Sequence, residues 1–233
     1  MNNLVTNPSL IVKYLFMRFY FQIENFVAQV AKQYDKPDTI LLDIGSGHSP
    51  YHKYFKKTRY LTNDIKQNEN KTIDIIGNIE KGLPKVKSSS LDYVICTQVI
   101  EHLTDPQLAF KEFNRMLKPN GKLFLTTNFL YQIHMAPYDY YRFTSFGLEH
   151  LGKSVGFKID HLRSHGGIFQ VLSYIITTLP VRLYLKNHYR LTLIYLVAFS
   201  PIILVLNLTA TILDGLDRDR ELTINYEVIY TKP

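Results

Sequence analysis

The stretch that decides the fold of this chain is Leu41-Leu42-Asp43-Ile44-Gly45-Ser46-Gly47-His48-Ser49-Pro50-Tyr51. An apolar run ends in an acidic residue and then in two glycines that one residue separates, which predicts a buried strand leading into a tight loop. Glycine adopts positive φ angles and has no Cβ, so such a loop lets the backbone approach a small ligand closely. Because glycine-rich turns after strands are common, the stretch predicts a ligand loop only together with motifs at the right distances further along the chain.

Length and composition bound the class of protein. The chain has 233 residues, of which 46% are apolar, and this suits one globular domain with a substantial core. Its 27 basic and 20 acidic residues give a net charge of +7, but the basic residues are scattered, with loose clusters only at 53–59 and 182–190. They form no nucleic-acid-binding arm, so no nucleic-acid partner is expected, whereas attraction to anionic lipid headgroups stays open.

The single cysteine and the N-terminal segment bear on the compartment. Cys96 alone excludes an internal disulfide and any multi-cysteine metal site, which is consistent with a reducing cytoplasm. The apolar stretch Leu10–Phe21 contains two basic residues and no basic segment precedes it, so we do not expect a signal peptide. The pattern predicts instead an amphipathic helix from about Pro8 to Tyr34, within an N-terminal part that covers 1–38.

Strand and helix patterns alternate along the next part of the chain. Apolar, β-rich runs predict strands at Tyr60–Ile65, Thr72–Ile79, Leu91–Thr97, Lys122–Thr127 and Phe157–Leu162. Asp105 and Pro106 suit the N-cap and first turn of a helix that 118–121 would end, and another helix is expected from about Ser145 to Val155. This alternation predicts a parallel sheet with helices on both faces, which binds ligands beyond the carboxyl ends of its strands.

Five ordered blocks carry a resemblance to a known family. They are LDIGSG at 42–47, NDI at 63–65, GNIEKGLP at 77–84, LDYVICTQVIEHL at 91–103 and MLKPNGKL at 116–123. In this order they resemble the class I S-adenosylmethionine-dependent methyltransferases, and among these the methyltransferase type 11 domain, over roughly 39–163. The resemblance implies a Rossmann-like, doubly wound α/β fold. Its seven-stranded sheet would be mostly parallel with an antiparallel last strand, and S-adenosylmethionine would be the cofactor.

The resemblance also implies a set of cofactor-binding residues at the strand ends. The set comprises Asp43, Gly45, Ser46, Gly47, Asp64, Ile65, Asn78, Ile79, Thr97 and Gln98. Asp64 lies about 20 residues beyond the glycine loop, where a carboxylate can accept hydrogen bonds from ribose hydroxyls. Asp43 would anchor the loop and reach the cofactor amino group through water, with loop stabilisation alone as the alternative.

Two positions in these blocks need comment. Asn78 stands where the family usually has aspartate, and its amide oxygen can still accept a hydrogen bond from the adenine amino group. Pro50 stands where a nicotinamide-binding Rossmann oxidoreductase needs its third glycine for close packing of helix and strand, which disfavours that class of enzyme.

The residues after the fourth predicted strand admit a metal-site alternative. Gln98, Glu101 and His102 would lie on one side at the start of a helix. Glutamine is a poor ligand for most metals, and the same block occurs in the family without metal, so we favour a structural or capping role and expect no metal. Cys96 is expected to be a small core residue, because methyl transfer from a sulfonium needs no covalent enzyme intermediate.

The acceptor residues are sought in Tyr131–Thr144, which comes after the fifth predicted strand. Its pattern His-x-x-Pro-x-Asp-Tyr-Tyr-Arg-Phe-Thr resembles methyltransferases that accompany glycan and cell-surface polysaccharide assembly enzymes. A sugar hydroxyl is a weak nucleophile, so we expect His134 as general base, with Asp139 as its orienter or as the base itself. Tyr140 and Arg142 would hold the acceptor. In the alternative, His134 and Asp139 only bond the loop to itself, and its last threonine caps the next helix.

The region 164–220 is an apolar insertion. Ser164–Val181 has no charged residue if His165 is neutral, and Leu191–Leu213 has none over 23 residues, enough to span a bilayer. However, Glu221–Pro233 alternates like the family's last strand, which a single crossing would leave on the wrong side of the membrane. Two crossings would translocate the basic connector, against the positive-inside tendency. We therefore expect a helical hairpin that packs over the ligand edge or dips shallowly into one leaflet.

The sequence thus predicts four parts, which are 1–38, a methyltransferase core at 39–163, the insertion at 164–220, and a final strand at 221–233. The insertion stays open between a lid, a homodimer interface and a membrane-facing platform through 166–213. The implied function is methyl transfer to a hydroxyl of a glycan or lipid-linked glycan precursor at the cytoplasmic face of the membrane, so the expected partner is a small-molecule or glycolipid acceptor. The alternative is a cofactor-binding but inactive homologue that serves as a membrane-associated assembly partner.

Overall fold

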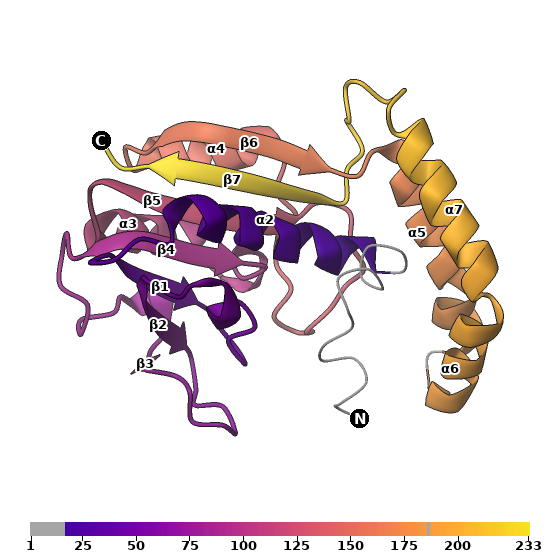
Figure 1. The fold of residues 1–233 in the computed structure, drawn as a ribbon, viewed down its shortest axis with the longest axis horizontal. Coiled ribbons are helices and arrows are strands. Elements are labelled where there is room, and N and C mark those ends of the chain that lie inside the picture. The colour runs from indigo at the N-terminus through magenta and orange to yellow at the C-terminus, as the bar shows by residue number, and fades with distance from the viewer. Residues whose placement is uncertain (1–16, 186) are drawn as a thin grey trace. The chain divides into compact units, whose positions relative to one another are not determined.

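The computed structural model describes residues 17–185 and 187–233, and Figure 1 shows their fold. They divide into two compact units. The larger contains Ile23–Arg163 and Tyr226–Pro233, and the smaller contains Ser164–Asn225 with the described residues up to Gln22. The N-terminal helix α2 spans Arg18–Tyr34, and the part of the expected helix before residue 17 lies outside the described residues.

The larger unit is built on a seven-stranded sheet with the order β3-β2-β1-β4-β5-β7-β6. Its strands are β1 Ile40–Ile44, β2 Arg59–Asp64, β3 Ile75–Ile76, β4 Leu91–Thr97, β5 Leu117–Asn128, β6 Lys158–His165 and β7 Asn225–Thr231. The strands from β3 to β5 pair in parallel, whereas β7 runs against β6 (Figure 1). The expected Rossmann-like sheet with an antiparallel last strand is therefore confirmed.

Helices and short turns connect the strands. They are the α-helices α3 Pro106–Met116 and α4 Ser145–Ser154 and the 3-10 turns η1 His52–Tyr54, η2 Ile79–Lys81 and η3 Ile100–His102. The expected start of α3 is confirmed, since the Asp105 carboxylate accepts hydrogen bonds from the backbone N–H of Gln107 and Leu108. Phe110 and Phe113 on its inner face are fully buried, as are Leu42 of β1 and Val94 of β4. This buried layer fixes the strand ends that carry the site.

Three strands differ clearly from the expected ones. The final strand, expected over Glu221–Pro233, is limited to Asn225–Thr231. The predicted strand Thr72–Ile79 is reduced to Ile75–Ile76, because a side chain replaces part of the ladder: the Asp74 carboxylate accepts hydrogen bonds from the backbone N–H and the hydroxyl of Thr62, each at 2.9 Å. Residues 118–121 do come after the end of α3, but they belong to β5, which begins at Leu117. A register shift beside β4 accommodates them.

The smaller unit holds the apolar insertion, which is helical as expected. It consists of α5 Ile168–Pro180, the π-helical turn η4 Val181–Leu185, α6 Tyr189–Ala198 and α7 Ser200–Leu213. In Figure 1, α5 and α7 run side by side and form a hairpin. By length and composition, Ile168–Leu185 is long and apolar enough to cross a membrane, and α6 with α7 would pass the same test together despite a bend of 65° between them.

Candidate active site

The loop after β1 is shaped by its two glycines. Gly45 has φ +67° and Gly47 has φ +54°, in the left-handed region where side chains cause strain. A Cβ at Gly45 would collide with the side chain of Val99, whereas a Cβ at Gly47 would meet nothing within 4 Å. The backbone is therefore closely packed on one side of the loop and open at Gly47, where a small ligand can approach it.

Asp64, at the end of β2, is held against this loop. Its Oδ2 accepts a hydrogen bond of 3.0 Å from the backbone N–H of Gly47, and its Oδ1 accepts one of 2.7 Å from the N–H of Ile65. A carboxylate offers about four acceptor positions, so two remain for the hydroxyls of a ribose. Ile65 exposes 68% of its surface and can cover such a ligand. Ser46 is buried, and its backbone N–H donates to the carbonyl of Asn63.

Asp43 is buried beneath the loop. Its carboxylate accepts a hydrogen bond of 2.5 Å from the hydroxyl of Tyr60. Burial raises the pKa of Asp43 to about 7, and the charge of Asp64 adds to the rise while the Tyr60 hydrogen bond opposes it. A cationic amino group placed nearby would favour the ionised form. Asp43 is thus suited to interact electrostatically with the ammonium group of an amino-acid ligand.

The remaining residues expected to hold the cofactor lie at the ends of neighbouring strands. Asn78 caps η2, with its Oδ1 accepting a hydrogen bond of 2.8 Å from the N–H of Glu80, so adenine would share an oxygen that is already engaged. Ile79 exposes only 4% of its surface, which leaves little of the side chain for a ligand. Thr97 ends β4, and Gln98 has φ +55° and donates to the hydroxyl of Thr126.

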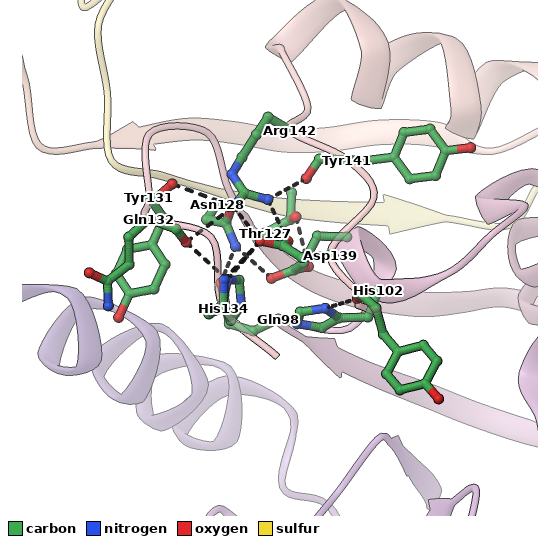
Figure 2. Close-up of polar contacts among 12 residues, drawn as sticks. Gln98, His102, Thr127, Asn128, Tyr131, Gln132, His134, Asp139, Tyr141 and Arg142 are labelled. Atoms are coloured by element: carbon green, nitrogen blue, oxygen red, sulfur yellow. Dashed lines mark hydrogen bonds and ion pairs between the residues drawn. The ribbon is translucent and has the colours of Figure 1, made fainter. Parts of the chain in front are cut away.

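Asp139, in the loop after β5, is paired with Arg142. The guanidinium donates two hydrogen bonds of 2.7 Å to the two carboxylate oxygens, and the backbone N–H of His134 donates a third of 3.0 Å (Figure 2). The Arg142 hydrogen bonds hold the pKa of Asp139 well below its usual range, against the opposing effect of burial. A carboxylate of such low basicity is a poor general base. Of the two roles expected for Asp139, the geometry favours that of orienter.

His134 and the two residues expected to hold the acceptor lie in the same loop. The Nδ1 atom of His134 is 3.4 Å from the Asp139 carboxylate. Arg142 also donates to the carbonyls of Gln132 and Tyr141, so its guanidinium ties the loop together. Tyr140 exposes 46% of its surface and presents its ring to solvent. The capping alternative for the last threonine of the loop holds, since its hydroxyl accepts from the N–H of Gly147.

The structure also places Glu101 in the site, where the sequence indicated only a structural role. Its carboxylate is fully buried and accepts hydrogen bonds from the Thr127 hydroxyl at 2.9 Å and the Asn128 amide at 2.8 Å. Burial raises the pKa of Glu101 to about 7. Asn128 is the last residue of β5, which pairs in parallel with β4. The expectation that these two strands are neighbours was the one feature of the sequence that could have predicted the contact between Asn128 and Glu101.

His102 and His134 meet beside Glu101. Their ring centroids are 4.6 Å apart, and the Nδ1 of His102 contacts the carbonyl of Tyr138 at 2.6 Å (Figure 2). One ligand atom from each of Glu101, His102 and His134 lies within 4.8 Å of the others, a spacing at which the three can hold a metal ion. The metal set considered from the sequence had Gln98 in place of His134. Cys96 is fully buried, and burial raises the pKa of its thiol, which fits a core residue.

Part of the chain is similar to a known protein family. Residues 42–125 match the family described as Methyltransferase domain. A curated relative, the ubiquinone biosynthesis O-methyltransferase of Xanthomonas oryzae pv. oryzae, is 44% identical over 41 residues. These residues are 18% of this chain, and the match spans only 17% of the length of the relative.

Three solved structures illustrate the likeness of fold. The [4+2]-cyclase SpnF superposes with a TM-score of 0.59 at 15% identity, over 91% of this chain and 80% of its own. A SAM-dependent methyltransferase from Archaeoglobus fulgidus gives 0.55 at 15% identity, over 90% and 94%. Phosphoethanolamine N-methyltransferase 2 of Haemonchus contortus, in complex with S-adenosyl-L-methionine, gives 0.55 at 18% identity, over 90% and 52%.

These findings confirm two expectations drawn from the sequence. Residues 42–125 match a methyltransferase domain, and S-adenosylmethionine is the cofactor of that class of domain. The described residues fit this cofactor, because the loop is open at Gly47, Asp64 retains acceptor positions beside it, and Asp43 is a buried carboxyl suited to an amino group. One of the similar structures is a cyclase, so the fold by itself does not define the reaction.

Proposed function

We propose that the chain is an S-adenosylmethionine-dependent methyltransferase that methylates a hydroxyl oxygen. Its acceptor would be a small molecule, and more narrowly a glycan or a lipid-linked glycan precursor at the cytoplasmic face of a membrane. The proposal rests on two groups of residues that lie at the carboxyl ends of strands of one sheet. The first group is the glycine loop with Asp64, and the second is the pair His134–Asp139. The first is suited to the cofactor, and the second to the removal of a proton.

The cofactor supplies an electrophilic methyl group when it is bound, and the chain supplies its placement. The backbone at Gly45 and Gly47 would face the amino-acid part, with Ser46 and Asp43 holding the loop from below. Asp64 and Ile65 would bind the ribose. Asn78 and Ile79 would flank the adenine, while Thr97 and Gln98 line the methionine part. Most of the rate acceleration would come from holding the acceptor oxygen in line with the methyl group.

His134 would remove the hydroxyl proton. Its Nδ1 contacts the carbonyl of Gln132 at 3.2 Å and the carboxylate of Asp139 at 3.4 Å, both of which favour a proton on Nδ1. That tautomer leaves Nε2 as the acceptor atom. As the acceptor oxygen receives the methyl group that the cofactor would supply as a sulfonium, the hydroxyl proton would pass to Nε2 of His134. Asp139 then stabilises the imidazolium, held in place by Arg142.

The acceptor class rests on two supports. The name of the curated relative assigns that protein an O-methyltransferase activity, which favours oxygen as the methylated atom. The loop around His134 exposes aromatic side chains, among them Tyr138 at 60% and Tyr140 at 46%, and such rings pack well on a sugar ring or another ring acceptor. The likeness of Tyr131–Thr144 to glycan-associated methyltransferases favours the glycan, and Tyr140 and Arg142 would contact it.

The proposal is tested with the purified chain, S-adenosylmethionine and two sets of acceptors. One set is lipid-linked glycan precursors and the other is phenolic quinone precursors, and release of S-adenosylhomocysteine is measured together with the mass of the product. A mass gain of one methyl group on the glycan set supports the full proposal, whereas a gain on the phenolic set keeps the activity and replaces the acceptor. Tight cofactor binding without turnover on any acceptor would favour the inactive homologue.

A further inference from the structure

The helical hairpin exposes more large apolar side chains than a water-soluble surface needs. Ile194 and Val197 of α6 are 62% and 67% exposed, and Val205 and Ile212 of α7 are 61% and 77% exposed. None of the described residues of α6 is buried. Leu193 and Leu196, which directly precede Ile194 and Val197 and point in other directions, are also 47% and 45% exposed, so the exposed set of α6 is not confined to one side. An apolar surface of this extent indicates a non-aqueous environment or a partner.

Several hydroxyl groups of the hairpin have hydrogen-bond partners within it. The Ser173 hydroxyl of α5 donates to the Asn207 side-chain oxygen of α7 at 2.9 Å, and the Tyr195 hydroxyl donates to the carbonyl of Thr177 at 3.0 Å. The hydroxyls of Thr178 and Thr211 donate to the carbonyls four residues before them. Hydroxyls in water need no such partners, whereas in hydrocarbon each unsatisfied group costs free energy. This arrangement suits a lipid environment.

The charges of the hairpin lie at its two ends. At the base, the Asp214 carboxylate accepts hydrogen bonds from the N–H groups of Gly167 and Phe169 and so caps α5. At the connector lie Arg182 and Arg190. The guanidinium of Arg182 lies 4.9 Å from the ring centre of Tyr174, and its Nε and Nη2 are buried with no hydrogen-bond partner among the described residues, whereas Arg190 is exposed. The exposed guanidinium of Arg190 can pair with a phosphate group.

We infer that Ile168–Leu213 is a monotopic membrane element that lies in one leaflet of an anionic bilayer. Its apolar surface contacts the acyl chains, Arg190 contacts lipid phosphates, and the positive charge of Arg182 adds to the attraction to the anionic headgroups. The 18 residues of Ile168–Leu185 measure about 27 Å as a helix, close to the hydrocarbon thickness of about 30 Å. A crossing would nevertheless carry both arginines to the far side, against the positive-inside rule, and the bend of 65° between α6 and α7 interrupts the return helix. A second copy of the chain would cover one side of α6 and leave the others in water.

The chain contains no tryptophan, which allows the depth of single positions to be measured. We would introduce Val197→Trp or Tyr184→Trp in the hairpin, and Phe146→Trp as the matched control, since Phe146 is 80% exposed on α4 of the other unit. Each full-length variant is mixed with vesicles of phosphatidylcholine, with or without phosphatidylglycerol, whose acyl chains are brominated near the headgroup or near the bilayer centre.

We expect the hairpin tryptophans to shift to the blue and to be quenched, most strongly by the bromines near the headgroup, and the Phe146→Trp signal to stay unchanged. The double variant Arg182→Gln/Arg190→Gln should bind anionic vesicles on the order of tenfold more weakly, with no change on neutral ones. Vesicle flotation measures binding directly, and a chain that floats with neither kind of vesicle overturns the inference. The inference also fails if the fluorescence of Tyr184→Trp is quenched most strongly by bromines near the bilayer centre. A blue shift without vesicles, together with dimers in sedimentation, also overturns it and assigns the surface to a second copy. Binding to vesicles needs no turnover, so this result is independent of the proposed activity.

Discussion

The central sheet and the helical hairpin bury their apolar side chains to opposite extents. Leu42 of β1 and Val94 of β4 are 0% exposed, because parallel strands are covered by chain on both faces. In α6 of the hairpin, none of the described residues is buried, and Ile194 is 62% exposed. The difference teaches that the sheet obtains its burial from its own unit, whereas the described residues leave much of the apolar surface of α6 uncovered.

The largest expected effect lies at the sheet edge. His134→Ala should lower turnover by about 10²- to 10⁴-fold, the usual contribution of a positioned general base, and leave both cofactor affinity and vesicle binding unchanged. Release of S-adenosylhomocysteine, calorimetry and flotation measure the three properties. His150→Ala is the control, because His150 is an exposed histidine on α4. A variant that keeps the parental rate would remove His134 from the mechanism.

Treatment with a chelator distinguishes a general base at His134 from a metal ligand at His134. If it acts as a base, the parent enzyme should keep its rate after treatment with EDTA. Loss of activity that returns with an added divalent metal would instead assign Glu101, His102 and His134 to a metal site, for which their mutual spacing is suitable.

The next effect tests the comparison of burial directly. Leu42→Ala should lower the free energy of unfolding by about 2–5 kcal/mol, because it removes buried methyl groups and leaves a cavity. Ile194→Ala should change it by less than about 0.5 kcal/mol, as at other exposed positions. Thermal unfolding followed by circular dichroism, without lipid, measures both. A large loss for Ile194→Ala would mean that the chain itself covers α6, and the contrast between the two regions would fail.

A smaller effect is expected from Asp64. Asp64→Ala removes hydrogen bonds to a charged acceptor, worth about 1.5–3 kcal/mol, so cofactor affinity should fall roughly tenfold to a hundredfold. Asp64→Asn keeps one acceptor oxygen and should lie between the alanine variant and the parent. Calorimetric titration with S-adenosylmethionine gives the dissociation constants. If Asp64→Ala binds as tightly as the parent, the cofactor arrangement proposed for the glycine loop is wrong.

The smallest effect concerns pH. The pKa of Asp43 is raised to about 7 by burial, so at pH 6 the carboxyl is mostly protonated and at pH 7.5 mostly ionised. Because the cofactor's ammonium group favours the ionised form, affinity should rise several-fold between these values. Asp43→Asn should flatten this dependence, and Tyr60→Phe should move it to higher pH by removing the hydrogen bond that opposes the rise. A dependence that survives in Asp43→Asn would assign it to another group.

Local patterns predicted the elements that depend on local interactions. The strand Leu91–Thr97 and the capped start of α3 at Asp105 arise from runs and caps that neighbouring residues complete by themselves. The strand expected at Thr72–Ile79 was too long, because its ladder ends where the Asp74 side chain bonds Thr62, twelve residues earlier in the chain. No pattern of alternating residues reveals that competition.

The same distinction holds within the site. The position of the glycine loop and Asp64 at the ends of neighbouring strands was predicted from sequence, since the turn requires glycine and the acid comes at a fixed spacing after it. The burial of Glu101 was missed, because Thr127 and Asn128 lie 26 and 27 residues away and meet it only when β5 pairs with β4. The low basicity of Asp139 likewise depends on the position of Arg142, not on its spacing alone.

The sequence by itself determined the class of fold, the methyltransferase domain and its cofactor, because ordered strand-end motifs and glycine positions encode backbone geometry directly. Only the tertiary structure decided which polar groups meet at the sheet edge and which apolar side chains stay uncovered. Hydrogen bonds, burial and pKa shifts depend on neighbours that are distant along the chain. In the stretch Leu41–Tyr51, the sequence specified the turn, and the contacts of Val99 and Asp64 specified which side of it is open.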